Sequence, residues 1–301
     1  MKKLKISKLI LVLLPLALVA GCVTSKKMKN IAVLPDQGPV EIVLRPTVGQ
    51  GDRTEYRSRT LTETFSNGEI TRKISEGVDF IVDTKVTHVD SANGVGTYDL
   101  TTVSKEGNID LSDFAMPELN ETLQYVLTKD GRVVRAGDMP VGTIYYVPPV
   151  SLPKGEVSVG DSWSMKAEWI SVKSGIPLRM EVVSILKNIR DCGAAGRCAE
   201  IELSGDVTIV GASKNVLSSN GKNDKDLLMR FRSDIQGQIL LSLNKGSVLH
   251  SIIRSEESLF GVKDTVRIKS CMLTYVTEPK EEHVMAEKSA ECDPLSDVLL
   301  F

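Results

Sequence analysis

The sequence of 301 residues has few histidines and lacks the common motifs of enzyme chemistry. Its three histidines do not form a His-Glu-x-x-His pair. It has no Gly-x-Ser-x-Gly turn for a serine nucleophile and no Gly-x-x-x-x-Gly-Lys or Gly-x-Gly-x-x-Gly loop to hold phosphates. Asp52 and Asp161 each follow a glycine before an expected strand, where an aspartate more often caps a turn than acts in catalysis. The sequence therefore favours a protein that is not an enzyme and uses no cofactor.

A metal-binding pattern and an excess of positive charge are also lacking. No Cys-x-x-Cys pair is present, and no histidine lies near a cysteine at ligand spacing. The chain has 37 basic and 39 acidic residues. Without the four lysines at positions 2, 3, 5 and 8, 33 basic residues remain against 39 acidic ones, a net charge of about −6. Such a chain has no general attraction for nucleic acid, so neither a metal nor a nucleic-acid partner is expected.

The N-terminus has the pattern of an export signal. The four lysines precede an apolar stretch over residues 9–20. This stretch is too short to span about 30 Å of hydrocarbon, which needs roughly 20 residues, but it fits the core of a secretory signal peptide. It ends in Leu-Val-Ala-Gly-Cys at positions 18–22. This ending resembles the lipobox of bacterial lipoproteins.

The resemblance implies cleavage after Gly21 and lipidation of Cys22, with diacylation of its sulfur. Two or three acyl chains hold a protein stably on a membrane, whereas a single chain is marginal. Ordinary secretion, with cleavage near Ala20 and a soluble product, is the alternative. In lipoproteins an aspartate after the cysteine often marks retention in the inner membrane. Val23 occupies that position here, which favours the outer membrane of a bacterial envelope, with the protein facing the periplasm.

The body of the chain has the alternating pattern and turn residues of antiparallel β-structure. Several runs place apolar residues at every second position, as in a strand with one buried face; they include Val78, Phe80, Val82, Val86, Trp163, Met165, Ile239 and Leu241. Dipeptides such as Asn67-Gly68 and Asp130-Gly131 separate these runs and favour hairpins. Apart from a short helix or turn near residues 112–120, helical signals are scarce. The sequence predicts an all-β fold of long antiparallel strands in curved sheets, with few or no helices after the signal peptide.

A weak internal repeat divides this body into two parts. Gly51-Asp52 and Gly160-Asp161 each precede an expected strand, and the turns at Asp130-Gly131 and Lys245-Gly246 have similar surroundings. Two related half-barrels are one arrangement and a single large sheet is the other, since all-β chains also reuse similar hairpins by chance. The predicted segments are a signal peptide (1–21), a lipidated N-terminus and tether (22–38), a first β half (39–140), a Pro-rich connector (141–158), a second β half (159–277) and a charged tail (278–301).

The Pro-rich connector and the residues after it, through Trp163, resemble an element of uncharacterised bacterial envelope proteins. That resemblance implies only a membrane-anchored β protein. It adds no activity.

Four cysteines remain besides Cys22, an even number that suits two disulfides in an oxidising compartment. Cys192 and Cys198 flank a loop of small residues between two expected strands, where a hairpin would bring them opposite each other. Cys271 lies on the last expected strand and Cys292 lies in the tail, which has little apolar content of its own. The predicted pairs are Cys192–Cys198 and Cys271–Cys292.

Two features remain as candidate ligand or docking sites. Tyr145 and Tyr146 lie beside Val147 and two prolines, a stretch that either plugs the edge of a sheet or forms a gate or docking surface. His88 ends an expected strand, either at a cavity rim or half-buried. The favoured function is a non-catalytic envelope lipoprotein that scaffolds or contacts another envelope component. The alternative is a carrier or sensor for a lipid or other hydrophobic ligand. A continuous inward-facing apolar cavity would favour this alternative, whereas a filled core with an exposed patch at residues 145–149 would favour the scaffold.

Overall fold

The computed structural model describes residues 31–35, 37–171, 175–210, 230–260, 264–279 and 292. Its strands are β1 (Val40–Glu41), β2 (Gly51–Ser66), β3 (Glu69–Asp90), β4 (Val95–Glu106), β5 (Thr122–Thr128), β6 (Val133–Ala136), β7 (Glu156–Val157), β8 (Ser162–Ile170), β9 (Pro177–Asp191), β10 (Arg197–Ile209), β11 (Arg230–Ser242), β12 (Ser247–Phe260) and β13 (Asp264–Glu278). Three short 3₁₀ turns accompany them: η1 (Leu111–Phe114), η2 (Ile144–Tyr146) and η3 (Gly193–Ala195). In this described part, no helix is long and apolar enough to cross a membrane.

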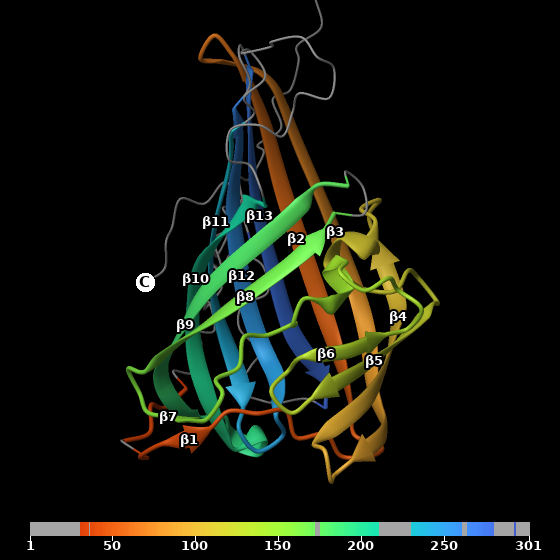
Figure 1. Ribbon diagram of the computed structural model, residues 1–301, viewed down its shortest axis with the longest axis vertical. Helices are drawn as coiled ribbons and strands as arrows, with labels where there is room; N and C mark the ends of the chain where they lie inside the picture. Colours follow the sequence, from red (N-terminus) through yellow and green to blue (C-terminus); the bar gives the residue numbers. More distant parts are fainter. Residues whose placement is uncertain are drawn as a thin grey trace, which may run out of the picture.

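Eleven of the strands form a single antiparallel sheet in the order β6-β5-β4-β3-β2-β13-β12-β11-β10-β9-β8. β1 and β7 form a separate pair. The large sheet is strongly curved, so both of its edge strands, β6 and β8, lie on the side toward the viewer (Figure 1). The all-β prediction is confirmed, and of its two arrangements the single continuous sheet is the one observed.

The predicted hairpin turns join successive strands. Asn67 and Gly68 both have positive φ, 53° and 87°, and connect β2 to β3. This backbone matches the right-handed twist of the paired strands, which explains why Asn-Gly is a strong hairpin signal. Gly246, between β11 and β12, has a φ of 63° and also lies against the backbone of Arg45. A side chain at position 246 would therefore clash with the incoming N-terminal segment.

Alternation along the strands gives the sheet an apolar inner face. Val82, Val86, Ile239 and Leu241 are all buried on this face, so the strand register inferred from their spacing is confirmed. Near the end of the molecule that holds β1 and β7, chain segments outside the large sheet complete the core. This cluster comprises Val40, Ile42, Val150, Val157, Leu186, Ile189, Ala199, Ile201, Ile239, Leu241 and Leu243.

The cluster also shows where the N-terminal segment packs. Although the predicted first β half begins at residue 39, Val40 pairs with Val157 and Ile42 packs against β9–β11. The physical reason is that the inner face of β9–β11 is apolar and needs a cover, which these residues and the connector provide.

The topology repeats in the way that the sequence repeat suggests. Strands β2–β6 and β8–β12 are each five-stranded meanders that run in the same order along the sheet. Asp130-Gly131 and Lys245-Gly246 occupy the turn between the fourth and fifth strand of their meanders, while Gly51 and Gly160 precede or begin the first strand. β13 has no counterpart and joins the meanders by pairing with both β12 and β2. The domain boundaries themselves stay a prediction.

Both predicted disulfides are present. Cys192–Cys198 closes the turn between β9 and β10, with 5.9 Å between the Cα atoms. Cys271–Cys292 holds position 292 against the outer face of β13, with 5.5 Å between the Cα atoms. The second bond belongs to a small cluster with Ile252, Leu273 and Tyr275.

We expect the two bonds to differ in their effect on stability. Cys271–Cys292 spans 21 residues and Cys192–Cys198 only 6. In the chain-entropy model the longer loop contributes about 3 kcal/mol and the shorter about 2 kcal/mol, because closing a longer loop removes more freedom from the unfolded chain. Urea unfolding of the C192S/C198S and C271S/C292S double variants measures both. A larger loss for the shorter loop would contradict this ranking.

Candidate functional site

The connector between the two meanders fills the space between the sheet edges β6 and β8. The backbone amide of Ile170 on β8 donates to the carbonyl of Gly142, with 2.8 Å between nitrogen and oxygen. On the other side, Tyr145 is 6% exposed and packs with residues of β5 and β6. The hydroxyl of Tyr146 donates to the carbonyl of Met139 at 3.3 Å. The connector is therefore a plug at the sheet edge, and Tyr145 is not part of an exposed docking surface.

Directly behind the connector lies a cavity of about 310 Å³. β3, β4 and β5 form its floor with their inner-face side chains, and η1 and the connector form its walls. Its described lining residues are Thr84, Tyr98, Leu100, Phe114, Ala115, Met116, Tyr125, Leu127, Ile144, Val147, Pro148 and Pro149. None of these described residues carries a charged side chain, so the cavity suits an apolar occupant.

The wall around η1 is fixed by polar contacts at both ends of the turn. The side chain of Asp110 accepts a hydrogen bond from the amide of Ser112 at 2.9 Å, and this caps the turn. At its other end Ala115 adopts a left-handed backbone with a φ of 56°. The Tyr125 hydroxyl donates to the carbonyl of Ala115 at 2.7 Å. Together these contacts direct Phe114 and Met116 toward the cavity.

Aromatic rings support this wall from beneath. Tyr56 and Phe80 are stacked with 4.7 Å between ring centroids, and Phe114 lies 5.9 Å from Phe80 in a tilted arrangement. Phe80 is only 1% exposed. Such ring pairs add about 0.5–1.5 kcal/mol beyond their burial, so the position of Phe114 depends on the core beneath it.

The tyrosine hydroxyls of the cavity stay uncharged at neutral pH. Burial raises the pKa of Tyr98 to about 12. Burial, with a smaller contribution from Tyr145, also raises the pKa of Tyr125. Both hydroxyls are therefore protonated at neutral pH and are poor general bases.

His88 lies away from the cavity wall, and the reason is a β-bulge. Val86 pairs with Tyr98, but His88 pairs with Thr97, so Thr87 is an extra residue in β3. One extra residue reverses which side chains face the core. His88 is consequently exposed and is not among the described residues that line the cavity. The expected position at a cavity rim, or half-buried, is wrong.

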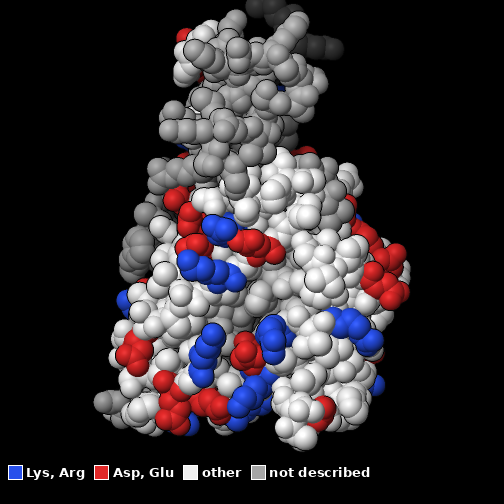
Figure 2. All heavy atoms as spheres, viewed as in Figure 1, with Lys and Arg blue, Asp and Glu red and all other residues white. Residues whose placement is uncertain are grey.

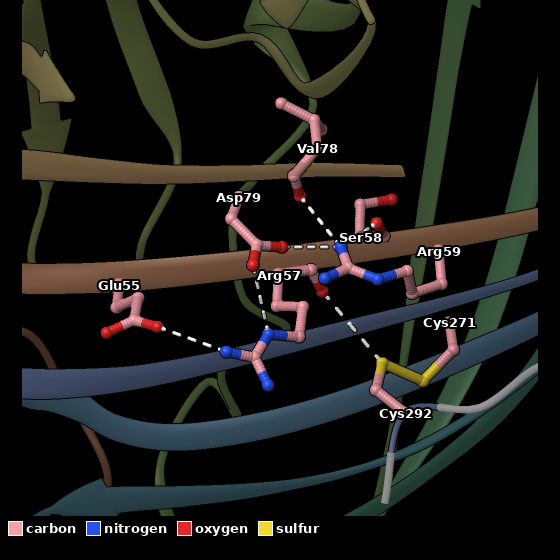
Figure 3. A network of polar contacts seen from close by, with 8 residues as sticks. All are labelled: Glu55, Arg57, Ser58, Arg59, Val78, Asp79, Cys271 and Cys292. Carbon is pink, nitrogen blue, oxygen red and sulfur yellow. Dashed lines mark hydrogen bonds and ion pairs between the residues drawn. A yellow bond between two sulfur atoms is a disulfide. The ribbon is translucent and has the colours of Figure 1, made fainter. Parts of the chain in front are cut away.

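A second cluster of polar residues lies on the outer face of β2, β3 and β13 (Figure 3). Arg57 contacts Glu55 at 3.5 Å and Asp79 at 3.3 Å, and Arg59 also pairs with Asp79. Arg59 donates to the carbonyl of Ser58 at 2.7 Å as well. The carboxylates are thus matched by guanidinium groups beside the Cys271–Cys292 bond. This arrangement ties three strands together and leaves little scope for acid–base chemistry.

Asp161, which the sequence analysis considered, and Glu200 also have structural partners. Asp161 accepts a hydrogen bond from the amide of Ser158 at 2.8 Å, which is the turn cap that its position favoured. Glu200 receives hydrogen bonds from Asn188, Arg190 and Gln238 at 2.6–2.7 Å. Arg190 also donates to the carbonyl of Ile31 at 2.8 Å, so this network holds the described start of the chain against the sheet.

Charges on the visible face are mixed in sign (Figure 2). On β8 and β9, Lys166 pairs with Glu181 at 3.0 Å and Arg179 with Glu168 at 2.7 Å. Around the connector the visible surface is mostly uncharged (Figure 2). This face therefore has no extended patch of one sign that would select a charged macromolecule.

Comparisons with known proteins give no family. No protein-family model matches the chain, and no curated protein matches it. Among solved structures, a variant of the Rh. blastica porin is similar at a TM-score of 0.27 and 10% identity, covering 75% of this chain and all of the porin. An outer membrane channel from Pseudomonas putida gives a TM-score of 0.22 at 9% identity, covering 79% of this chain and 99% of the channel. DynF, from the dynemicin biosynthesis pathway of Micromonospora chersina, gives 0.21 at 7% identity, covering 82% and 89%. These TM-scores carry no functional conclusion.

Proposed function

We propose that this protein is a non-catalytic lipoprotein of the bacterial outer membrane that binds a small hydrophobic ligand in the cavity behind its connector. Cys22, which lies outside the described residues, is the proposed lipid-bearing residue, and the periplasm is the proposed compartment. The membrane is then a partner through the anchor, and a lipid or another apolar molecule is the ligand.

The observation that carries this proposal is the apolar cavity between β3–β5 and the connector. The sequence left a scaffold and a carrier or sensor as alternatives. A scaffold that docks through the connector would present residues 145–149 at the surface. Of these five, Tyr145 is buried, residues 146–148 are partly buried and only Pro149 is exposed, and residues 147–149 also line the cavity. The sequence favoured the scaffold. The geometry supports the carrier or sensor better.

The size of the cavity limits what it can hold. Ligand pockets commonly measure about 300–1,000 Å³, and this one, at about 310 Å³, lies at the lower end. It suits one acyl chain or one compact ring system. A molecule with several chains would have to leave most of its apolar surface outside.

Filling the cavity should weaken binding without unfolding the protein. We expect Ala115→Leu to lower the affinity for the neutral fluorescent probe N-phenyl-1-naphthylamine at least about tenfold, because the added carbons occupy space that the probe needs. Fluorescence titration of the mature protein measures this, and circular dichroism verifies the fold. Ala92→Leu, in the exposed turn between β3 and β4, is the matched control. Equal binding by all three proteins would show that the probe binds elsewhere.

A direct test uses protein purified from its own envelope. Native mass spectrometry should detect the mature protein with one bound lipid-like molecule. A protein that carries no such molecule and binds no apolar probe would favour the scaffold instead.

A further inference from the structure

The inner face of the second meander continues as an apolar surface beyond the part that the connector covers. Met165 on β8 lies opposite Val182 on β9, and Val182 lies opposite Gly205 on β10. From this row, every second residue in the direction away from β1 and β7 also faces inward. We call this surface the upper inner face. Its large, partly buried apolar side chains are Met165, Trp169, Leu178, Met180, Val207 and Ile235.

The described segments that cover the lower part of the meander stop short of this surface. The core cluster beneath residues 40–43 and the connector ends at Trp163 and Leu203, which pack against it. None of the core clusters in the described part of the chain includes a residue of the upper inner face. Farther along β8, the amide of Ile170 bonds the carbonyl of Gly142, but this contact lies at the strand edge, in the plane of the sheet. β8, β9 and β10 extend well beyond β1 and β7 (Figure 1).

Two glycines bend the strands around the upper inner face. A Cβ atom added at Gly205 would lie 2.1 Å from the carbonyl oxygen of Glu181, and one added at Gly237 would lie 2.7 Å from that of Ile252. Glycine inside a strand commonly marks such a bend. Both added atoms would point inward, so the neighbouring strands fold toward the inner face. The surface is therefore concave, in agreement with the strong curvature of the sheet (Figure 1).

The chemistry of this surface favours an acyl chain as its occupant. Its described inward positions on β8–β11 carry no charge, since Lys166 and Glu181 pair on the outer face and the inward carboxylate of Glu257 lies on β12. β9 and β10 are paired on both sides within the sheet, so their backbones cannot bind an added peptide strand. Met165 and Met180 have flexible side chains, which adapt to an occupant without a fixed shape.

The dimensions of the surface agree with one such chain. From Leu203 to Ile209, β10 rises about 20 Å. The chains of one bilayer leaflet are about 15 Å long, because two leaflets share about 30 Å of hydrocarbon. We infer that the upper inner face binds one acyl chain of a lipid, as a second site separate from the cavity over β3–β5. The driving force is the removal of the chain and of the partly exposed side chains from water.

The two tryptophans of the chain are built-in reporters for this site, because both face inward on β8. Trp163→Phe leaves Trp169 on the upper inner face as the reporter, and Trp169→Phe leaves Trp163, which packs against the covered core. Bromine quenches indole emission on contact. We expect dibromostearate, below its micelle concentration, to remove most of the Trp169 emission of the mature protein and little of the Trp163 emission, with stearate as the unbrominated reference. No loss at Trp169, or an equal loss at both residues, would overturn the inference.

Met180→Glu, in the protein that retains Trp169, should weaken binding of dibromostearate at least about tenfold, because the chain would cover an unpaired carboxylate. Val183→Glu is the matched control, since Val183 is 45% exposed on the outer face of the same strand. Equal affinities of these two variants would contradict the site.

Ala115→Leu, which narrows the cavity of the proposed function, should leave quenching of Trp169 intact. Loss of quenching in this variant would place the chain in that cavity and overturn the second site. Binding of N-phenyl-1-naphthylamine without any quenching by dibromostearate would also overturn this inference, while the proposed function would stand.

Discussion

Replacing Cys22 with serine is expected to move the protein from the membrane fraction to the soluble fraction of the envelope. The reason is chemical: the serine hydroxyl is not a substrate for thiol acylation, and without lipid the chain loses the anchor proposed for it. Fractionation followed by mass measurement of the intact protein gives both readouts, the compartment and the mass of the attached acyl chains.

Thr24→Ser is the matched control, because it makes an equally small change two residues beyond the proposed lipid site. It should remain with the membrane and keep its acyl chains. If Cys22→Ser still gained acyl chains and sedimented with membrane, the lipobox interpretation would be wrong. Loss of the acyl chains with retention on the membrane would instead indicate a second means of attachment.

Phe80→Ala should cause the largest loss of stability among single substitutions near the cavity. Phe80 is almost fully buried, stacks on Tyr56 and supports Phe114. Removing a buried phenylalanine costs about 3–5 kcal/mol, through lost burial and the cavity left behind. Because Phe114 lines the ligand cavity, binding of the apolar probe should weaken as well. Urea unfolding and probe titration measure the two effects.

The control for this substitution is Phe260→Ala at the end of β12. Phe260 is 41% exposed, and surface substitutions usually change stability by about 0.5 kcal/mol or less. Similar losses for the two variants would mean that Phe80 is not the packing centre of this region. A large loss of stability with unchanged probe binding would show that the wall at Phe114 does not depend on Phe80.

Several structural features follow from local signals alone. The alternation around Val82 and Ile239 predicts the buried face, because successive side chains along a strand point to opposite faces of the sheet. Asn67-Gly68 predicts a hairpin, because both residues tolerate the positive φ that the turn requires. The pairing of Cys192 with Cys198 follows from the same logic, since a hairpin brings its two ends together.

Other features depend on contacts between distant parts of the chain. The pairing of β2 with β13 joins residues 51–66 to residues 264–278, and no local pattern selects that partner or its register. The bulge at Thr87 turns His88 outward, although the residues around it continue the alternation. Each bulge reverses which of the following side chains face the core, so the buried positions of a strand cannot be assigned until its bulges are known.

The cavity was also predictable only in part. Its apolar floor on β3–β5 is visible in the sequence as alternating residues, and the connector is recognisable from its prolines and aromatic residues. By itself the sequence determined the all-β class, the hairpins, the Cys192–Cys198 pair and most of the apolar faces, because each depends on backbone preferences or on neighbours along the chain. Only the tertiary structure decided that residues 40–43 cover the second meander while a space stays open over the first. Which apolar face is covered by the protein's own chain depends on the competing packing of segments far apart in sequence.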